Sequence, residues 1–197
     1  MNVSPTGRIH EIYLLFIKIQ LDMMNELKEN KGVVAFTGTP LTLLGEMIQV
    51  GNTAPDFTAV GRDSKPVSLS DFKGKTVILS VFPSIDTGVC AMQTKRFNKE
   101  ATSLSENVVV LTLSKDLPFA LGRFCAAEGI DRIHTLSDYM QSEFGRKYGF
   151  LIKENMLLAR GVVVINPEGK VVYVEYVKEL TTEPDYEKAL NAAKSTL

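Results

Sequence analysis

The chain is poor in cysteine, because only Cys90 and Cys125 occur among its 197 residues. Two cysteines cannot build the dense disulfide framework of small secreted domains, and a chain of this length does not need one for stability. This scarcity favours a reducing compartment, so we expect a cytoplasmic protein. In such a compartment, paired thiols more often carry out redox chemistry, or have no chemical role, than act as structural staples.

An excess of charge is also lacking, since 22 basic residues stand against 23 acidic ones and give a net charge of -1. No block of like charges creates the positive field that attracts nucleic acid or an anionic membrane, so we expect neither as a partner. Histidine is scarce as well. His10 and His134 have no metal-ligand spacing around them, and the sequence therefore predicts no metal and no cofactor.

No hydrophobic run is long enough to span a bilayer. Residues 12–21 hold eight apolar side chains, but Lys18 interrupts the run, which is shorter than the ~20 residues that a spanning helix needs. A small-residue cleavage site does not follow it, and a targeting role is the weaker of two interpretations. We interpret residues 1–23 as an atypical extension, either disordered or derived from upstream sequence, and residues 24–197 as a single domain.

The rest of the chain alternates between strand and helix patterns. Apolar and β-branched runs predict strands at residues 33–36, 41–45, 76–82, 107–113, 133–136, 161–165 and 171–177, with an extended segment at 54–60. Helical patterns predict one helix that ends near residue 103 and others at about 117–128, 140–148 and 183–195. Gly129 is placed to end the second of them.

The order of these elements predicts an α/β fold, with helices flanking a mixed central sheet. Residues 76–82 are apolar on both faces, as expected of a buried central strand. Two strands around the turn sequence "TGTP" predict an N-terminal β-hairpin at residues 33–45. Residues 161–177 contain the turn "NPEGK" and predict an antiparallel hairpin at one edge of the sheet.

The stretch "PSIDTGVC", residues 83–90, joins the predicted central strand to a helix. If Asp86 or Thr87 caps this helix, Cys90 lies in its first turn, where free N–H groups and the macrodipole favour an anion. A thiolate would be stabilised there and would be nucleophilic at neutral pH. The alternative is a small buried hydrophobe, the usual role of a free cysteine, and Cys90 alone does not decide between them.

Thr87 stands three residues before Cys90, where a disulfide oxidoreductase of the thioredoxin kind would carry its other cysteine. A dithiol at this turn is therefore excluded. The hydroxyl can instead hydrogen-bond both the sulfur anion and a bound oxygen substrate. Pro83 would add a rigid apolar wall without an N–H donor and limit the access of water to the sulfur.

The pattern Pro83-x-x-x-Thr87-x-x-Cys90 resembles the P-x-x-x-T-x-x-C signature of peroxiredoxins. A narrower resemblance, to the bacterial thiol peroxidase subfamily of atypical two-cysteine peroxiredoxins, rests on three segments that occur in this order: "SIDTGVC", "DLPFALGRFC" and "LTTEPDY". It covers the chain from about residue 32 to the C-terminus. The resemblance implies a thioredoxin-like fold with an added N-terminal hairpin, a homodimer, and reduction of hydroperoxides at the expense of thioredoxin.

Carried over by position, the resemblance makes Cys90 the peroxidatic cysteine, Thr87 the hydroxyl that holds peroxide and thiolate, and Cys125 the resolving cysteine. From the residues alone, a buried helix residue between apolar neighbours is the better explanation of Cys125, and the resemblance reverses this preference. The resemblance also assigns Arg160 to the thiolate, although its position equally suits a solvated charge at a strand end. Arg123 is a lesser candidate that we expect at the surface.

Two other function classes remain as alternatives. One is a thioredoxin-like adaptor in which Cys90 and Cys125 form a structural disulfide, and the other is a thiol-transfer enzyme acting on protein disulfides. A structural disulfide gives no reason for Thr87 and Pro83, and disulfide exchange generally uses a nearby partner cysteine. The sequence therefore argues against both alternatives, and the resemblance implies a peroxidase with an intramolecular Cys90–Cys125 disulfide.

Overall fold

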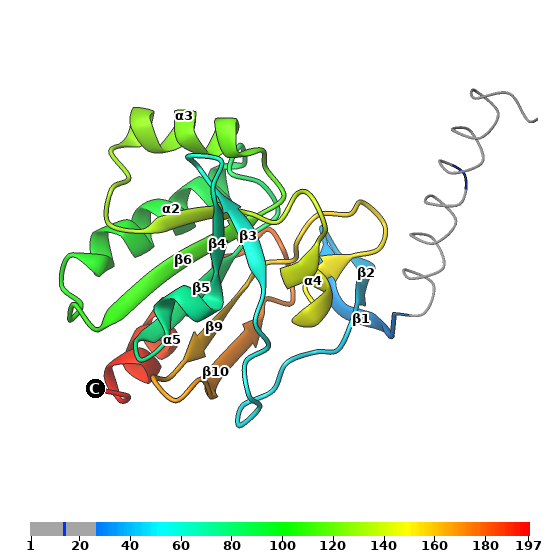
Figure 1. Cartoon of the computed structure of the whole chain (residues 1–197). Coiled ribbons are helices and arrows are strands. Elements are labelled where there is room, and N and C mark those ends of the chain that lie inside the picture. Colours follow the sequence, from blue (N-terminus) through cyan, green and yellow to red (C-terminus); the bar gives the residue numbers. More distant parts are fainter. Residues whose placement is uncertain (1–13, 15–26) are drawn as a thin grey trace, which may run out of the picture.

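Seven strands form the main sheet of the computed structural model, which describes Leu14 and residues 27–197 (Figure 1). Their order across the sheet is β10-β9-β5-β6-β7-β3-β4. Strands β5, β6 and β7 are parallel, while β9 runs antiparallel to β5, so the sheet is mixed as predicted. The strands are β3 (Thr58–Gly61), β4 (Pro66–Ser68), β5 (Thr76–Val81), β6 (Val108–Ser114), β7 (His134–Ser137), β9 (Gly161–Ile165) and β10 (Val171–Tyr176).

The helices of the described part follow the predicted order: α2 (Gly88–Ala101), α3 (Pro118–Glu128), α4 (Glu143–Lys147) and α5 (Tyr186–Lys194), with a short 3₁₀ turn, η1 (Leu69–Phe72). Gly129 ends α3 in the left-handed conformation, with a φ of 65°, as expected of a helix-terminating glycine. None of these helices has the length and hydrophobicity to cross a membrane, a statement limited to the described residues.

Helix α4 is shorter than the predicted segment at 140–148. The carboxylate of Asp138 accepts hydrogen bonds from the backbone N–H groups of Phe144 and Gly145, which fixes the start of the helix. Ser142, just before it, is left-handed with a φ of 52° and cannot belong to the helix. The prediction was wrong here because this start depends on a side chain five residues upstream of the helix.

The predicted N-terminal hairpin is present as β1 (Glu29–Phe36) and β2 (Thr39–Leu44). Its two turn residues, Thr37 and Gly38, both have positive φ, which matches the twist of the flanking strands. A short strand that the sequence did not reveal, β8 (Leu151–Ile152), pairs with β2 and completes a separate three-stranded sheet. The proposed extension, residues 1–23, lies outside the described residues apart from Leu14.

Both faces of the main sheet are covered. On β5, Ile78 belongs to an apolar cluster with Phe97 of α2 and Ala189 of α5. Leu79 belongs to a cluster on the opposite face, together with Phe144 of α4 and residues of the hairpin. Figure 1 shows β1, β2 and α4 grouped to one side and α2 and α5 to the other. Strand β5 is thus buried on both faces, and the loop after its C-terminal end leads to the candidate site.

Candidate active site

Cys90 lies in the first turn of α2, as the sequence predicts. Thr87 is the N-cap residue, with extended backbone angles, and the helix begins at Gly88. The side chain of Cys90 is fully buried and packs with Phe82 and Leu121. Its sulfur is therefore close to the helix N-terminus and shielded from bulk water, two conditions that strengthen electrostatic effects on it.

Arg160 provides the charge that faces Cys90. It precedes β9 and is only 2 % exposed, and its Nη2 donates a hydrogen bond of 3.2 Å to the Sγ of Cys90. No salt bridge among the described residues includes Arg160. The guanidinium therefore places a positive charge directly at the Cys90 sulfur, where it can stabilise negative charge that develops there.

The other two nitrogens of the guanidinium also donate hydrogen bonds. Nη1 of Arg160 donates to Oε1 of Gln93 at 2.6 Å, and Nε donates to the carbonyl oxygen of Leu180 at 3.0 Å. Gln93 is fully buried one turn after Cys90 and donates in turn to Ser80 Oγ and to the carbonyl of Val81. These bonds hold Arg160 in place at the sulfur.

Gln93 is a residue that the sequence analysis missed. Its signal was its spacing, because a residue three positions after Cys90 lies on the same helix face and is buried with it. A glutamine on a buried helix face needs polar partners. The position of Gln93 therefore indicated that other elements place polar groups close to Cys90.

Thr87 and Pro83 line a cavity of about 470 Å³ that also reaches Arg160. The hydroxyl of Thr87, an exposed residue, donates to the carbonyl oxygen of Ser84 at 3.3 Å. Apolar residues of other elements complete the wall, including Phe36, Leu41, Ile152, Leu157 and Leu180. The cavity can thus place a small molecule with an apolar part beside the guanidinium.

Cys125 lies on α3 and is 3 % exposed, with its sulfur 3.5 Å from the hydroxyl oxygen of Thr135. Both cysteines are free thiols. They belong to different apolar clusters, with Leu121 packed in the Cys90 cluster and Phe124 packed against both. A disulfide between them therefore requires the two sulfurs to leave these separate clusters and approach each other.

Comparison with known proteins agrees with this geometry. The family model described as Redoxin matches residues 49–190. The thiol peroxidase of Oceanobacillus iheyensis is 54% identical over 158 residues, which cover 80% of this chain and 96% of that protein. The thiol peroxidase of Bacillus subtilis is 53% identical over 162 residues, which cover 82% of this chain and 96% of that protein.

The chain belongs to the thiol peroxidases of the redoxin family. It is accordingly an oxidoreductase of the peroxidase class that reduces peroxide at the expense of thiols.

Solved structures show the same fold. A peroxiredoxin-like protein from Aquifex aeolicus superimposes with a TM-score of 0.79 at 38% identity, covering 83% of this chain and 96% of the other. The thiol peroxidase from Chromobacterium violaceum gives a TM-score of 0.73 at 19% identity, covering 83% of this chain and 98% of the other, which supports the fold alone. The predicted thioredoxin-like α/β fold is confirmed.

The remaining polar candidates of this thiol peroxidase lie apart from the cysteines. Arg123 is exposed on α3, as expected. His134 packs its ring edge-to-face against Phe72 at 5.2 Å between centroids. Partial desolvation, and then the nearby cations Arg62 and Lys75, lower the pKa of His134 below its ordinary value. These contacts give His134 a packing role.

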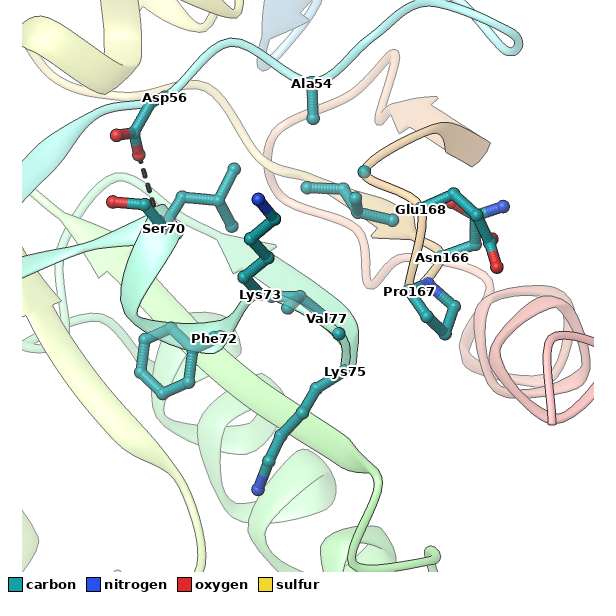
Figure 2. Close-up of a pocket in the computed structure, with 14 residues that line it drawn as sticks. Ala54, Asp56, Ser70, Phe72, Lys73, Lys75, Val77, Asn166, Pro167 and Glu168 are labelled. Carbon is teal, nitrogen blue, oxygen red and sulfur yellow. Dashed lines mark hydrogen bonds between the residues drawn. The ribbon is translucent and has the colours of Figure 1, made fainter.

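A second hollow in this thiol peroxidase, of about 270 Å³, lies at the opposite end of the sheet (Figure 2). It is bordered by Val77, at the start of β5, and by Ile165, at the end of β9, whereas Cys90 follows the other end of β5. Figure 2 shows the ammonium groups of Lys73 and Lys75 pointing away from each other. The two charges do not converge on one ligand position, so we assign this hollow no function.

Proposed function

We propose that this chain reduces hydroperoxides with Cys90 as the peroxidatic cysteine and Cys125 as the resolving cysteine. The observation that carries the proposal is the buried guanidinium of Arg160, which donates to the Cys90 sulfur at 3.2 Å in the first turn of α2. This pairing provides a nucleophile and, beside it, the donors that a leaving oxygen needs.

In the first step, the Cys90 thiolate attacks the terminal oxygen of the hydroperoxide. A sulfur–oxygen bond forms and the oxygen–oxygen bond breaks, and its electron pair passes to the leaving oxygen, which takes a proton and departs as water or alcohol. Cys90 becomes a sulfenic acid. Arg160, the Thr87 hydroxyl and the free N–H groups of α2 are the donors for the developing oxyanion.

In the second step, the sulfur of Cys125 attacks the sulfur of the Cys90 sulfenic acid. The disulfide forms as the sulfur–oxygen bond breaks, and the hydroxide leaves as water with the proton of the Cys125 thiol. The two Cα atoms must approach to within about 7 Å. Because Leu121 and Phe124 pack around the cysteines, local unwinding of α3 is the movement that fits this step.

A dithiol must then reduce the disulfide by exchange, supplying two electrons and two protons and becoming a disulfide itself. We propose thioredoxin as this reductant, a cytoplasmic location and a homodimer, all by analogy with thiol peroxidases. The deciding assay measures consumption of hydrogen peroxide and of an alkyl hydroperoxide with thioredoxin and its reductase. Cys90→Ser is the control, and equal turnover by this variant would refute the assignment of Cys90.

Cys90 should be the more reactive thiol of the reduced protein at neutral pH. The guanidinium of Arg160 donates to the Cys90 sulfur and stabilises negative charge on it, whereas the Cys125 sulfur contacts the neutral hydroxyl of Thr135. Timed alkylation across a pH series, read by mass spectrometry of peptides, measures both cysteines. Faster alkylation of Cys125 at neutral pH would reverse the roles.

Thr87→Val should lower kcat/KM for peroxide about tenfold or more, because a hydrogen bond to a charged group is worth ~1.5–3 kcal/mol. The fold should persist, since valine is similar in size and the Thr87 side chain makes no capping hydrogen bond to α2. Thr87→Ser keeps the hydroxyl and is the matched control, from which we expect much of the activity. Equal rates for the valine and serine variants would remove the hydroxyl from the mechanism.

A further inference from the structure

Asp116 links the loop that precedes Cys90 to the segment that precedes α3. It lies between β6 and α3, two residues before Pro118, the first residue of the helix that carries Cys125. Its Oδ1 accepts a hydrogen bond of 2.7 Å from the hydroxyl of Ser84, and its Oδ2 accepts one of 2.7 Å from the backbone N–H of Ile85. Each carboxylate oxygen therefore holds one residue of the Cys90 loop.

The backbone of Asp116 is itself fixed to the sheet. Its N–H donates to Ser114 Oγ at 3.3 Å, and the hydroxyl of Ser137 donates to its carbonyl oxygen. Ser114 and Ser137 are the last residues of the parallel neighbours β6 and β7. The carboxylate is thus presented to the loop from a rigid position.

Ser84 is the centre of the turn that shapes the cavity. Its hydroxyl accepts from the N–H of Asp86 at 3.3 Å, and its carbonyl accepts from both the N–H and the hydroxyl of Thr87. Pro83 and Thr87, on either side of this turn, line the cavity that reaches Arg160. By holding Ser84 and Ile85, Asp116 fixes the positions of these two residues.

The two bonds are charge-assisted, because their acceptor is a carboxylate. No salt bridge between described residues involves Asp116, so its charge is directed at the loop. The bonds join the segments directly ahead of both helices that carry the cysteines. They oppose any movement of the first turn of α2 relative to the first turn of α3.

We propose that Asp116 is a positioning residue that favours the peroxide-reactive conformation over the one in which Cys90 and Cys125 meet. This inference rests on the proposed roles of the two cysteines. While its bonds are intact, the loop presents Thr87 and Cys90 to peroxide. When they break, the first turns of the two helices can move relative to each other, so that Cys90 and Cys125 can approach and form the disulfide. Asp116 therefore sets how long the sulfenic acid persists before Cys125 captures it.

Asp116→Ala should change the two steps in opposite directions. Attack on peroxide, measured by rapid quenching in a Cys125→Ser background, should slow about tenfold or more because two charge-assisted bonds are lost. Disulfide formation should become faster relative to overoxidation, so that about tenfold more peroxide is needed for the same fraction of sulfinic acid at Cys90. Intact mass separates the disulfide, a loss of two hydrogens, from the sulfinic acid, a gain of two oxygens.

Asp116→Asn should have a smaller effect in the same directions, because the amide keeps the shape and the Ser84 hydroxyl can turn to accept from it. The matched control is Asp86→Asn, which removes a negative charge from an exposed side chain of the same loop. We expect Asp86→Asn to leave both steps unchanged. If Asp116→Ala does not fold, Ser84→Ala removes one of the two bonds. It should likewise slow the attack on peroxide and speed disulfide formation relative to overoxidation.

A purely structural role would slow both steps together, in proportion to a lower melting temperature, and this result would overturn the inference. Unchanged partition between disulfide and sulfinic acid in folded Asp116→Ala or Ser84→Ala would also overturn it. Failure of the proposed function looks different, because the unsubstituted protein would then form no Cys90–Cys125 disulfide with peroxide. A normal disulfide in that protein, with unchanged partition in the variants, refutes the role of Asp116 alone.

Discussion

Cys125→Ser should reduce about one equivalent of hydrogen peroxide per subunit and then stop. Attack by Cys90 does not require Cys125, so the first step proceeds and leaves a sulfenic acid without a thiol to resolve it. Turnover with thioredoxin should collapse. At excess peroxide the stalled Cys90 should gain two or three oxygens, which intact-mass measurement detects.

The unsubstituted protein is the control for this prediction. After oxidation it should lose two hydrogens and remain monomeric on a non-reducing denaturing gel, because the proposed disulfide joins residues of one chain. A disulfide-linked dimer as the main product would show resolution between subunits. Sustained thioredoxin-dependent turnover by Cys125→Ser would show that Cys125 is only the buried core residue that its apolar neighbours allow.

Arg160→Met should lower the rate of peroxide reduction by about 10²–10³-fold, the usual cost of removing a donor to a developing oxyanion. The reactivity of Cys90 towards an alkylating reagent should fall as well, because the cation that stabilises negative charge at its sulfur is gone. Two acceptors, Oε1 of Gln93 and the carbonyl of Leu180, also lose their partner. Stopped-flow peroxide kinetics and timed alkylation measure the two effects.

Arg123→Met is the matched control, since it makes the same substitution at an exposed arginine of α3. We expect its peroxide kinetics to equal those of the unsubstituted protein. Arg160→Lys keeps the charge but not the planar fork, which pairs with Cys90, Gln93 and Leu180 together, and should recover only part of the activity. Normal peroxide kinetics in folded Arg160→Met would remove the guanidinium from the mechanism.

Elements with local signals were predicted closely from the sequence. Helix α3 begins one residue after its predicted start and ends where predicted. Pro118 is favourable in the first turn of a helix, and Gly129 is favourable in the left-handed conformation that ends one. Strand β9 has its predicted bounds, and the turn after it returns the chain as β10. In each case the deciding residues are adjacent in the sequence.

Contacts between distant residues were not predictable in the same way. Strand β8 has only two residues, and it exists because the hairpin strand β2 lies beside it. Residues 83–90 are a local motif and were found, and a family resemblance supplied Arg160. The local motif and the resemblance do not reveal that Gln93 positions the guanidinium or that Asp116 holds the loop. The bond between Gln93 and Arg160 joins residues 67 apart in sequence, and the bond between Ser84 and Asp116 joins residues 32 apart.

The N-terminal hairpin is joined to Arg160 by an unbroken series of hydrogen bonds. The N–H of Leu180 donates to the carbonyl of Ala35 in β1, and the carbonyl of Leu180 accepts from Arg160. The carboxylate of Glu179 accepts from the N–H groups of the hairpin turn at Thr37 and Gly38.

The matched redoxin range, residues 49–190, begins after this hairpin. A domain defined by that range would keep Cys90, Cys125 and Arg160. It would lack Ala35, whose carbonyl accepts the hydrogen bond from the N–H of Leu180. It would also lack the part of the cavity wall formed by Phe36 and Leu41. The complete site therefore extends beyond the residues that define the family, and a transplant of the site that keeps all of these contacts includes β1 and β2.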